Sequence, residues 1–204
     1  MNIFPNLKPE VWIPINLNEE SKKTNLDLSN PVVCDNWLNN FHKSMNADYS
    51  YGGFLEDRTY IWRNRANEIK GSKIHLGIDY NVPAGSLVAM PQDGIVFHIM
   101  KDPRNNIGWG GRIIWKLNNS TYLLYGHLKQ DIKLKIGQIC KKGEIVAIIG
   151  DINDNGYWFP HLHVQIMNQT FIDHYENNLD EIDGYLPKND AGINNVIDPG
   201  SIIR

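Results

Sequence analysis

Two histidines alternate with apolar residues in the last third of the chain. His161 and His163 follow Pro160 and flank Leu162, and Val164 comes next. Successive side chains of a strand point to opposite faces, so this alternation predicts two imidazoles on one face above an apolar underside. Imidazoles bind metal ions and exchange protons near neutral pH. By itself, however, a His-x-His pair is equally consistent with two hydrogen-bonded histidines that have no role in chemistry.

Two other segments carry side chains of the same chemistry. His75 and Asp79 are four residues apart and share one face of an extended segment, and a turn at Gly77 would bring them closer. His127 ends an apolar strand predicted within residues 122–128, where the rim of a cleft would lie. Imidazole and carboxylate groups are both good zinc ligands. His75 and Asp79 alone would be read as a hydrogen-bonded pair.

The five side chains together predict a catalytic metal site. Three of them would fill three positions of a tetrahedral zinc ion and leave the fourth for water, as in catalytic zinc sites. The other two would be available for proton transfer. The five residues are His75, Asp79, His127, His161 and His163.

Short apolar runs from residue 73 onward predict the scaffold that positions these side chains. The runs are separated by Gly, Pro, Asn and Asp, and they cover residues 86–90, 94–100, 112–117, 121–125 and 144–149. Regularly spaced short strands with turn residues between them favour an antiparallel β-sandwich or barrel over βαβ units. We therefore expect a mainly β domain over residues 73–204.

Residues 1–72 are rich in Asn, Pro and Ser, and we expect an irregular extension packed on the core. One short helix is predicted over residues 35–43, with Asp35 as its N-cap. His42, near its end, is expected at the surface. Asp57 and Arg58 are expected to form a structural ion pair in preference to facing a cleft.

The charge, the cysteine content and the absence of long apolar runs bear on the binding partners and the cellular location of the chain. The 204-residue chain has a net charge of −3 and no basic stripe, which argues against a nucleic-acid partner. Cys34 and Cys140 indicate neither a disulfide framework nor a cysteine zinc site, and whether they pair stays open. No signal peptide or membrane span is visible, so we expect a cytoplasmic chain or export by a route that the sequence does not reveal. The oligomeric state stays open.

The ordered set of motifs resembles the lysostaphin/LytM-type zinc metallopeptidases, which cleave peptide cross-links of bacterial cell walls. The resemblance covers roughly residues 73–203. The motifs that carry it are His75-x-x-x-Asp79, Gly77-Ile-Asp-Tyr-Asn-Val-Pro-Ala-Gly85, Asp93-Gly-Ile-Val96, Tyr125-Gly-His-Leu128, Ile136-Gly-Gln-x-x-Lys-Lys-Gly143, Pro160-His-Leu-His-Val-Gln-Ile166 and Ile197-Asp-Pro199.

The resemblance implies a role for each of the five residues. His75, Asp79 and His163 would bind one Zn²⁺ per chain, and His127 and His161 would form the catalytic pair. It also implies a small antiparallel β domain with the metal in an open groove, and hydrolysis of peptide or peptidoglycan amide bonds by a metal-activated water. Which of the two catalytic histidines is the base stays open.

The segment before the histidine strand departs from the family, whose loop is usually small and rich in Ser, Thr and Gly. Here it carries Tyr157, Trp158 and Phe159, which with Tyr60 are candidates for substrate contacts, although ordinary packing explains them equally well. Two other functions therefore stay open. One is a non-catalytic regulatory module that binds peptide or peptidoglycan, and the other is a hydrolase of a different peptide-like amide.

Overall fold

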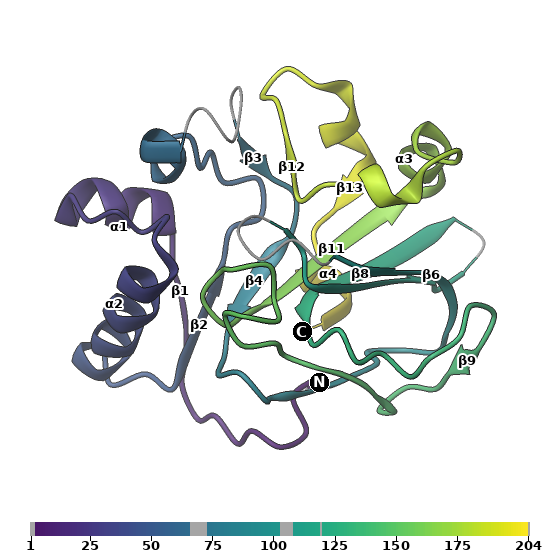
Figure 1. The fold of residues 1–204 in the computed structure, drawn as a ribbon, viewed down its shortest axis with the longest axis horizontal. Coiled ribbons are helices and arrows are strands. Elements are labelled where there is room, and N and C mark those ends of the chain that lie inside the picture. Colours follow the sequence, from purple (N-terminus) through teal and green to yellow (C-terminus); the bar gives the residue numbers. More distant parts are fainter. Residues whose placement is uncertain (1–2, 66–72, 103–107, 119, 204) are drawn as a thin grey trace.

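The fold is built on one mixed sheet, described by a computed structural model over residues 3–65, 73–102, 108–118 and 120–203. Nine of the described strands form this sheet, with β13 paired to β11 beside the main path (Figure 1). Neighbouring strands are antiparallel except for the parallel pair β1–β2. In spatial order the strands are β1 (Trp12–Pro14), β2 (Tyr49–Gly52), β4 (Ile78–Asn81), β11 (Leu162–Asn168), β8 (Thr121–Leu128), β7 (Gly111–Lys116), β6 (Gly94–Lys101) and β9 (Ile139–Cys140), with β13 at Val196–Ile197.

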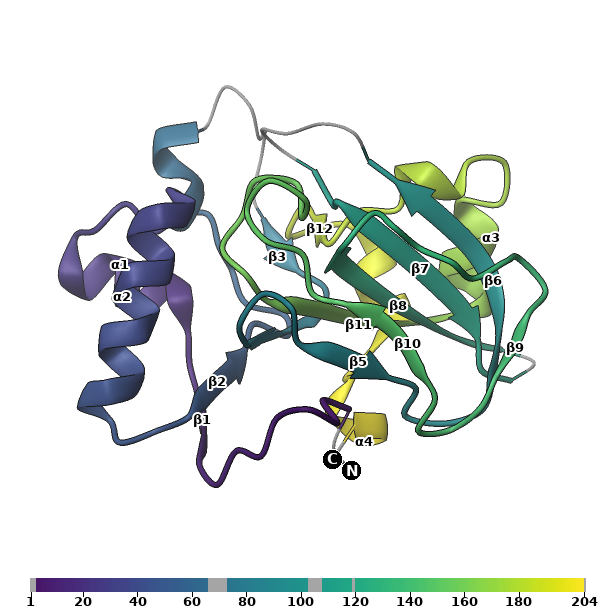
Figure 2. The same cartoon turned by 60° about the horizontal axis from the view of Figure 1, so that its bottom comes forward.

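Smaller elements surround this sheet. Two further strand pairs are β5 (Leu87–Ala89) with β10 (Ile145–Ile148), and β3 (Ile74–His75) with β12 (Tyr185–Leu186). The helices are α1 (Leu17–Thr24), α2 (Pro31–Ser44), α3 (Gln169–His174) and α4 (Gly200–Ile203), and the 3₁₀ turns are η1 (Ile61–Arg65), η2 (Leu179–Glu181) and η3 (Ala191–Asn195). Figures 1 and 2 show α1 and α2 beside β1 and β2, at the end of the molecule opposite β6 and β9.

The central strands bury side chains on both faces. On β8, Leu123 and Tyr125 belong to one apolar cluster, whereas Leu124 belongs to the cluster on the opposite face. The same alternation divides Val164 and Ile166 of β11 from Met167. Period-two alternation sends neighbours to opposite faces, and both faces are covered, so these strands read as nearly continuous apolar runs. The histidine strand therefore lies in the part of the sheet that is buried on both faces.

The expected fold class is confirmed, and each predicted apolar run from residue 86 to 149 contains a strand. The described part of the N-terminal extension is more regular than expected, because it contains two α-helices, two strands and one 3₁₀ turn. Strand β2 pairs with β4, so the main sheet continues across the expected domain boundary. Residues 66–72, next to that boundary, lie outside the described residues, and the division at residue 73 stays a prediction. Cys34 and Cys140 are both buried, free thiols.

The prediction of a surface position for His42 is wrong, because this side chain is only 8% exposed. Its Nε2 lies 2.8 Å from Ser50 Oγ, which also accepts a hydrogen bond from Asn81 Nδ2 at 2.8 Å. Ser50 can therefore donate its hydroxyl proton to a neutral His42. This chain of bonds joins α2 to β2 and β4.

Truncating the buried Leu123, which is 0% exposed, tests the role of the core. We expect Leu123→Ala to lower the free energy of unfolding by about 2–5 kcal/mol, because it removes buried methyl groups and leaves a cavity. Ile136→Ala, at a position that is 66% exposed, is the matched control and should change it by less than about 0.5 kcal/mol. Urea unfolding measures both, and equal losses would contradict this account of the core.

The buried His42 predicts a pH dependence of stability. Burial lowers the pKa of His42 below its usual value, so the unfolded chain takes up this proton first as the pH falls below about 6.5. The stabilisation is fully present above that pH and decreases below it. We expect the difference in free energy of unfolding between wild type and His42→Gln to shrink from pH 7.5 to pH 5.5. Urea titrations across this range measure it, and a constant difference would refute the assignment.

Candidate active site

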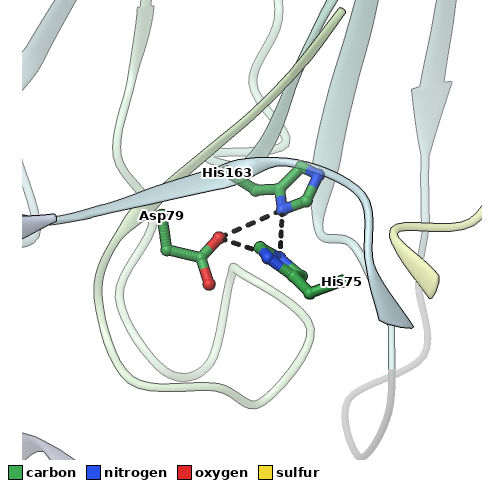
Figure 3. A group of neighbouring side chains, drawn as sticks. All are labelled: His75, Asp79 and His163. Atoms are coloured by element: carbon green, nitrogen blue, oxygen red, sulfur yellow. Dashed lines mark hydrogen bonds and ion pairs between the residues drawn. The ribbon is translucent and has the colours of Figure 1, made fainter. Parts of the chain in front are cut away.

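Three side chains converge from three strands: His75 from β3, Asp79 from β4 and His163 from β11 (Figure 3). His163 and Asp79 are register partners across β11 and β4, which brings the imidazole beside the carboxylate. His163 Nδ1 lies 3.0 Å from Asp79 Oδ1 and 2.9 Å from His75 Nε2, and His75 Nε2 lies 3.3 Å from Asp79 Oδ1. The candidate ligand atoms all lie within 4.8 Å of one another.

Outward hydrogen bonds orient both imidazoles. His75 Nδ1 lies 2.9 Å from the carbonyl oxygen of Gly53, which can only accept, so Nδ1 carries the proton. His163 Nε2 donates in the same way to Gln165 Oε1 at 3.2 Å. In the neutral tautomers that these bonds favour, lone pairs of both rings point at Asp79 Oδ1. Three lone-pair atoms this close need a proton or a cation between them, and such outward partners are typical of metal-binding histidines.

Electrostatics give two of these groups the protonation states that a metal ion requires. Burial, followed by the nearby Arg58 guanidinium, lowers the pKa of His75 to about 4, so its imidazole is neutral at pH 7. Burial alone would raise the pKa of Asp79, but His75 and Arg58 together hold it well below its usual value. A neutral imidazole and an ionised carboxylate are the forms that bind metal ions.

His127 and His161 form a second pair next to these three side chains. Their ring centroids are 4.3 Å apart, and His161 Nε2 lies 3.7 Å from Asp79 Oδ1. The Nδ1–H of His127 donates to the carbonyl of Asn155 at 2.8 Å, and that of His161 donates to the carbonyl of Phe159 at 2.7 Å. Each Nε2 is therefore left as a proton acceptor.

Burial keeps the second pair neutral as well. It lowers the pKa of His161 to about 4. Burial, with His161 nearby, also lowers the pKa of His127 well below its usual value. The backbone of His127 has a φ of 62°, a left-handed conformation that costs a residue with a Cβ about 1–3 kcal/mol. Strain of this kind clusters at functional sites.

The structure thus brings together all five predicted chemical residues. The three candidate ligands, expected in an open groove, are at most 2% exposed.

The four candidates for substrate contacts do not lie together in one place. Phe159 stacks on His161 at a centroid distance of 4.6 Å, and Trp158 stacks on Trp62 at 4.9 Å. Tyr157 is 42% exposed, and Tyr60 donates its hydroxyl to Asn25 at 3.3 Å. Their contact with substrate stays a prediction.

Four residues around the site were given no role from the sequence. Trp109 packs edge-on against His163 with ring centroids 5.0 Å apart, and Tyr185 lies 5.2 Å from His75. Gly53 accepts from His75, and Gln165 accepts from His163. Only Gln165 had a usable signal, since it shares the strand face of His163. The prediction of an Asp57–Arg58 pair is wrong, because Arg58 pairs with Glu56 and Asp79.

Comparison with known proteins identifies the family. Residues 73–176, about half of the chain, match the sequence model of peptidase family M23. The chain belongs to peptidase family M23. All five residues described above lie within the matched segment. An uncharacterized metalloprotease of Haemophilus influenzae is 33% identical over 104 residues, which are 50% of this chain and 20% of that protein. The match therefore spans only about a fifth of the length of the Haemophilus influenzae protein.

The chain is also similar to solved structures, and the first of the two described here supports the fold. The catalytic domain of the antimicrobial peptidase lysostaphin from Staphylococcus simulans matches with a TM-score of 0.51 and 22% identity, covering 83% of this chain and 96% of that one. A zinc-containing peptidase from Vibrio cholerae matches with a TM-score of 0.40 and 30% identity, over 47% of this chain and 28% of that one.

None of the helices in the described part of the chain has the length and apolar character of a membrane-spanning segment.

Gly53 offers a test of how tightly His75 is held. A Cβ at Gly53, where φ is +103°, would lie 2.7 Å from His75 Nδ1 and 2.4 Å from Arg58. Gly137→Ala is the matched control, because its φ is +84° but nothing lies within 4 Å. Backbone strain should cost the control about 1–2 kcal/mol. We expect Gly53→Ala to lose more stability in urea unfolding and to shift the imidazole NMR signals of His75, and equal effects would contradict the packing described here.

Proposed function

We propose that this M23 chain is a zinc-dependent metalloendopeptidase that hydrolyses peptide amide bonds by a metal-activated water. The observation that supports it is the convergence of His75 Nε2, Asp79 Oδ1 and His163 Nδ1. The other ring nitrogen of each histidine donates a hydrogen bond away from this point. Two imidazole nitrogens and one carboxylate oxygen suit zinc and leave a fourth tetrahedral position for water or substrate. When bound, zinc supplies a Lewis acid that lowers the pKa of a bound water from about 15.7 to about 7.

His127 and His161 would carry the protons. Both are neutral at pH 7, and each presents Nε2 as an acceptor because its Nδ1–H donates to a backbone carbonyl. One imidazole can therefore take a proton from the attacking water and later give it to the leaving amine. Once protonated, the same Nε2 can donate a hydrogen bond to a developing oxyanion. Either His127 or His161 can be the imidazole that takes this proton, because both present Nε2 in the same way.

For the substrate, we propose peptidoglycan cross-link or stem peptides. Membership of the M23 family and the ordered motifs around the five site residues support this class. Tyr157 is exposed, next to two buried aromatic residues that lead to His161, and it is the candidate for the first contact with substrate. The presence of all five chemical side chains favours an enzyme over a non-catalytic binding module.

Substitution of the two groups of residues should separate metal binding from turnover. We expect His75→Ala and His163→Ala to lose zinc and activity together. His127→Ala and His161→Ala should keep stoichiometric zinc and lose about 10²- to 10⁴-fold in kcat, the usual contribution of general acid–base catalysis. Metal analysis and cleavage rates on purified wall fragments measure both. The exposed His174→Ala is the control, and a zinc-free His127→Ala protein would overturn the assignment.

Chelation distinguishes the competing functions. Wall fragments and a general peptide panel are incubated with the protein, with and without chelator, and the products are identified by mass spectrometry. Chelator-sensitive cleavage of wall peptides supports the proposal, and cleavage of other peptides alone supports a different amide substrate. Peptide binding without metal and without products would establish the binding module instead.

A further inference from the structure

Arg58 joins the N-terminal extension to the proposed metal centre. It lies outside the segment that matches the M23 family, and it is only 2% exposed. Its Nη1 donates to Asp79 Oδ2 at 2.6 Å and to the hydroxyl of Tyr185 at 3.2 Å, and its Nε donates to Glu56 Oε2 at 3.0 Å. The guanidinium is thus held from two sides while it contacts a candidate ligand.

The two carboxylate oxygens of Asp79 have different partners because Arg58 binds only one of them. Oδ2 accepts the short bond from Arg58, whereas Oδ1 faces His75 and His163. A carboxylate whose Oδ2 is fixed in this way cannot rotate about its χ2 angle without breaking a charge-assisted hydrogen bond. It therefore presents one oxygen to the metal position. Outer partners of this kind orient metal ligands in many sites.

Glu56 prevents Arg58 from opposing cation binding. A lone guanidinium beside Asp79 would cancel the carboxylate charge and repel a divalent ion. Glu56 is 7% exposed, balances that charge, and is itself held by the backbone N–H of Asn18 in α1 at 2.7 Å. The three charged groups leave one net negative charge at Asp79. Charge balance and directional bonding thus favour a metal ligand that is both ionised and oriented.

We propose that Arg58 is a positioning residue that fixes Asp79 for metal binding, so that the functional metal centre includes the Glu56–Arg58 segment of the extension. The inference rests on the proposed zinc centre described above. It predicts that the ligand geometry depends on a residue that the family motifs do not contain.

The test measures zinc affinity and ligand geometry in the full chain. The Glu56→Gln/Arg58→Met double variant removes both extension charges, so no unpaired Glu56 remains. Zinc affinity is obtained by competition with a chromophoric chelator, and geometry from the visible absorption of the Co²⁺-substituted protein. We expect about 10- to 100-fold weaker zinc binding and a changed Co²⁺ spectrum. Arg63→Met, in the same extension but bonded to Ser21 and Tyr60, should match wild type.

Arg58→Lys separates positioning from charge and guards against loss of the fold in the double variant. Lysine keeps the positive charge but lacks the rigid fork that reaches Asp79 and Glu56 together. We expect it to keep a cooperative thermal transition and still bind zinc more weakly than wild type. Wild-type affinity in either variant, with an unchanged Co²⁺ spectrum, would overturn the inference and leave the proposed function intact. A wild-type chain without zinc affinity would overturn both.

Discussion

The site depends on one electrostatic constraint: lone pairs of His75, Asp79 and His163 face one another in a buried space. Their closest approaches are 2.9–3.3 Å, and the opposite atoms of both rings already donate elsewhere. Burying such a group is costly unless a positive charge stands between its members. The fold must therefore hold mutually repelling groups in place, and a divalent ion is the charge that this donor set fits.

The sheet supplies the stiffness that holds them. Asp79 and His163 are register partners in the interior of the sheet, so a slip of one residue would turn one of them to the other face. Gly126 on β8 allows the ring of Trp109 to pack against the strand, because a Cβ at this position would lie 2.4 Å from that ring. Trp109 in turn stacks on His127. Packing of the central strands thus fixes the positions of His163 and His127.

Local signals were sufficient to predict the strands of the β domain and to single out the five side chains that the structure brings together. Alternation placed His161 and His163 on one face, and apolar runs between turn residues located the strands. The extension was harder to predict, because the N-cap of α2 is Asn30, five residues before the expected cap Asp35. This Asn-Pro start is a readable signal. The burial of His42 depends on Ser50 and Asn81, which pair only through tertiary structure, and no local pattern predicts that.

Arg58 of the extension contacts the site through tertiary structure that no local motif encodes. A motif search finds residues whose spacing is set by one strand or turn, such as His75 and Asp79. Arg58 reaches Asp79 across 21 positions, through a segment whose fold is set by its own bonds to α1. Its nearest charged neighbour in sequence, Asp57, turns instead to Thr59. Adjacent opposite charges are thus a poor guide to ion pairing. Leaving a buried carboxylate unpaired is costly, so the buried Arg58 pairs with the buried Asp79 and not with its sequence neighbour.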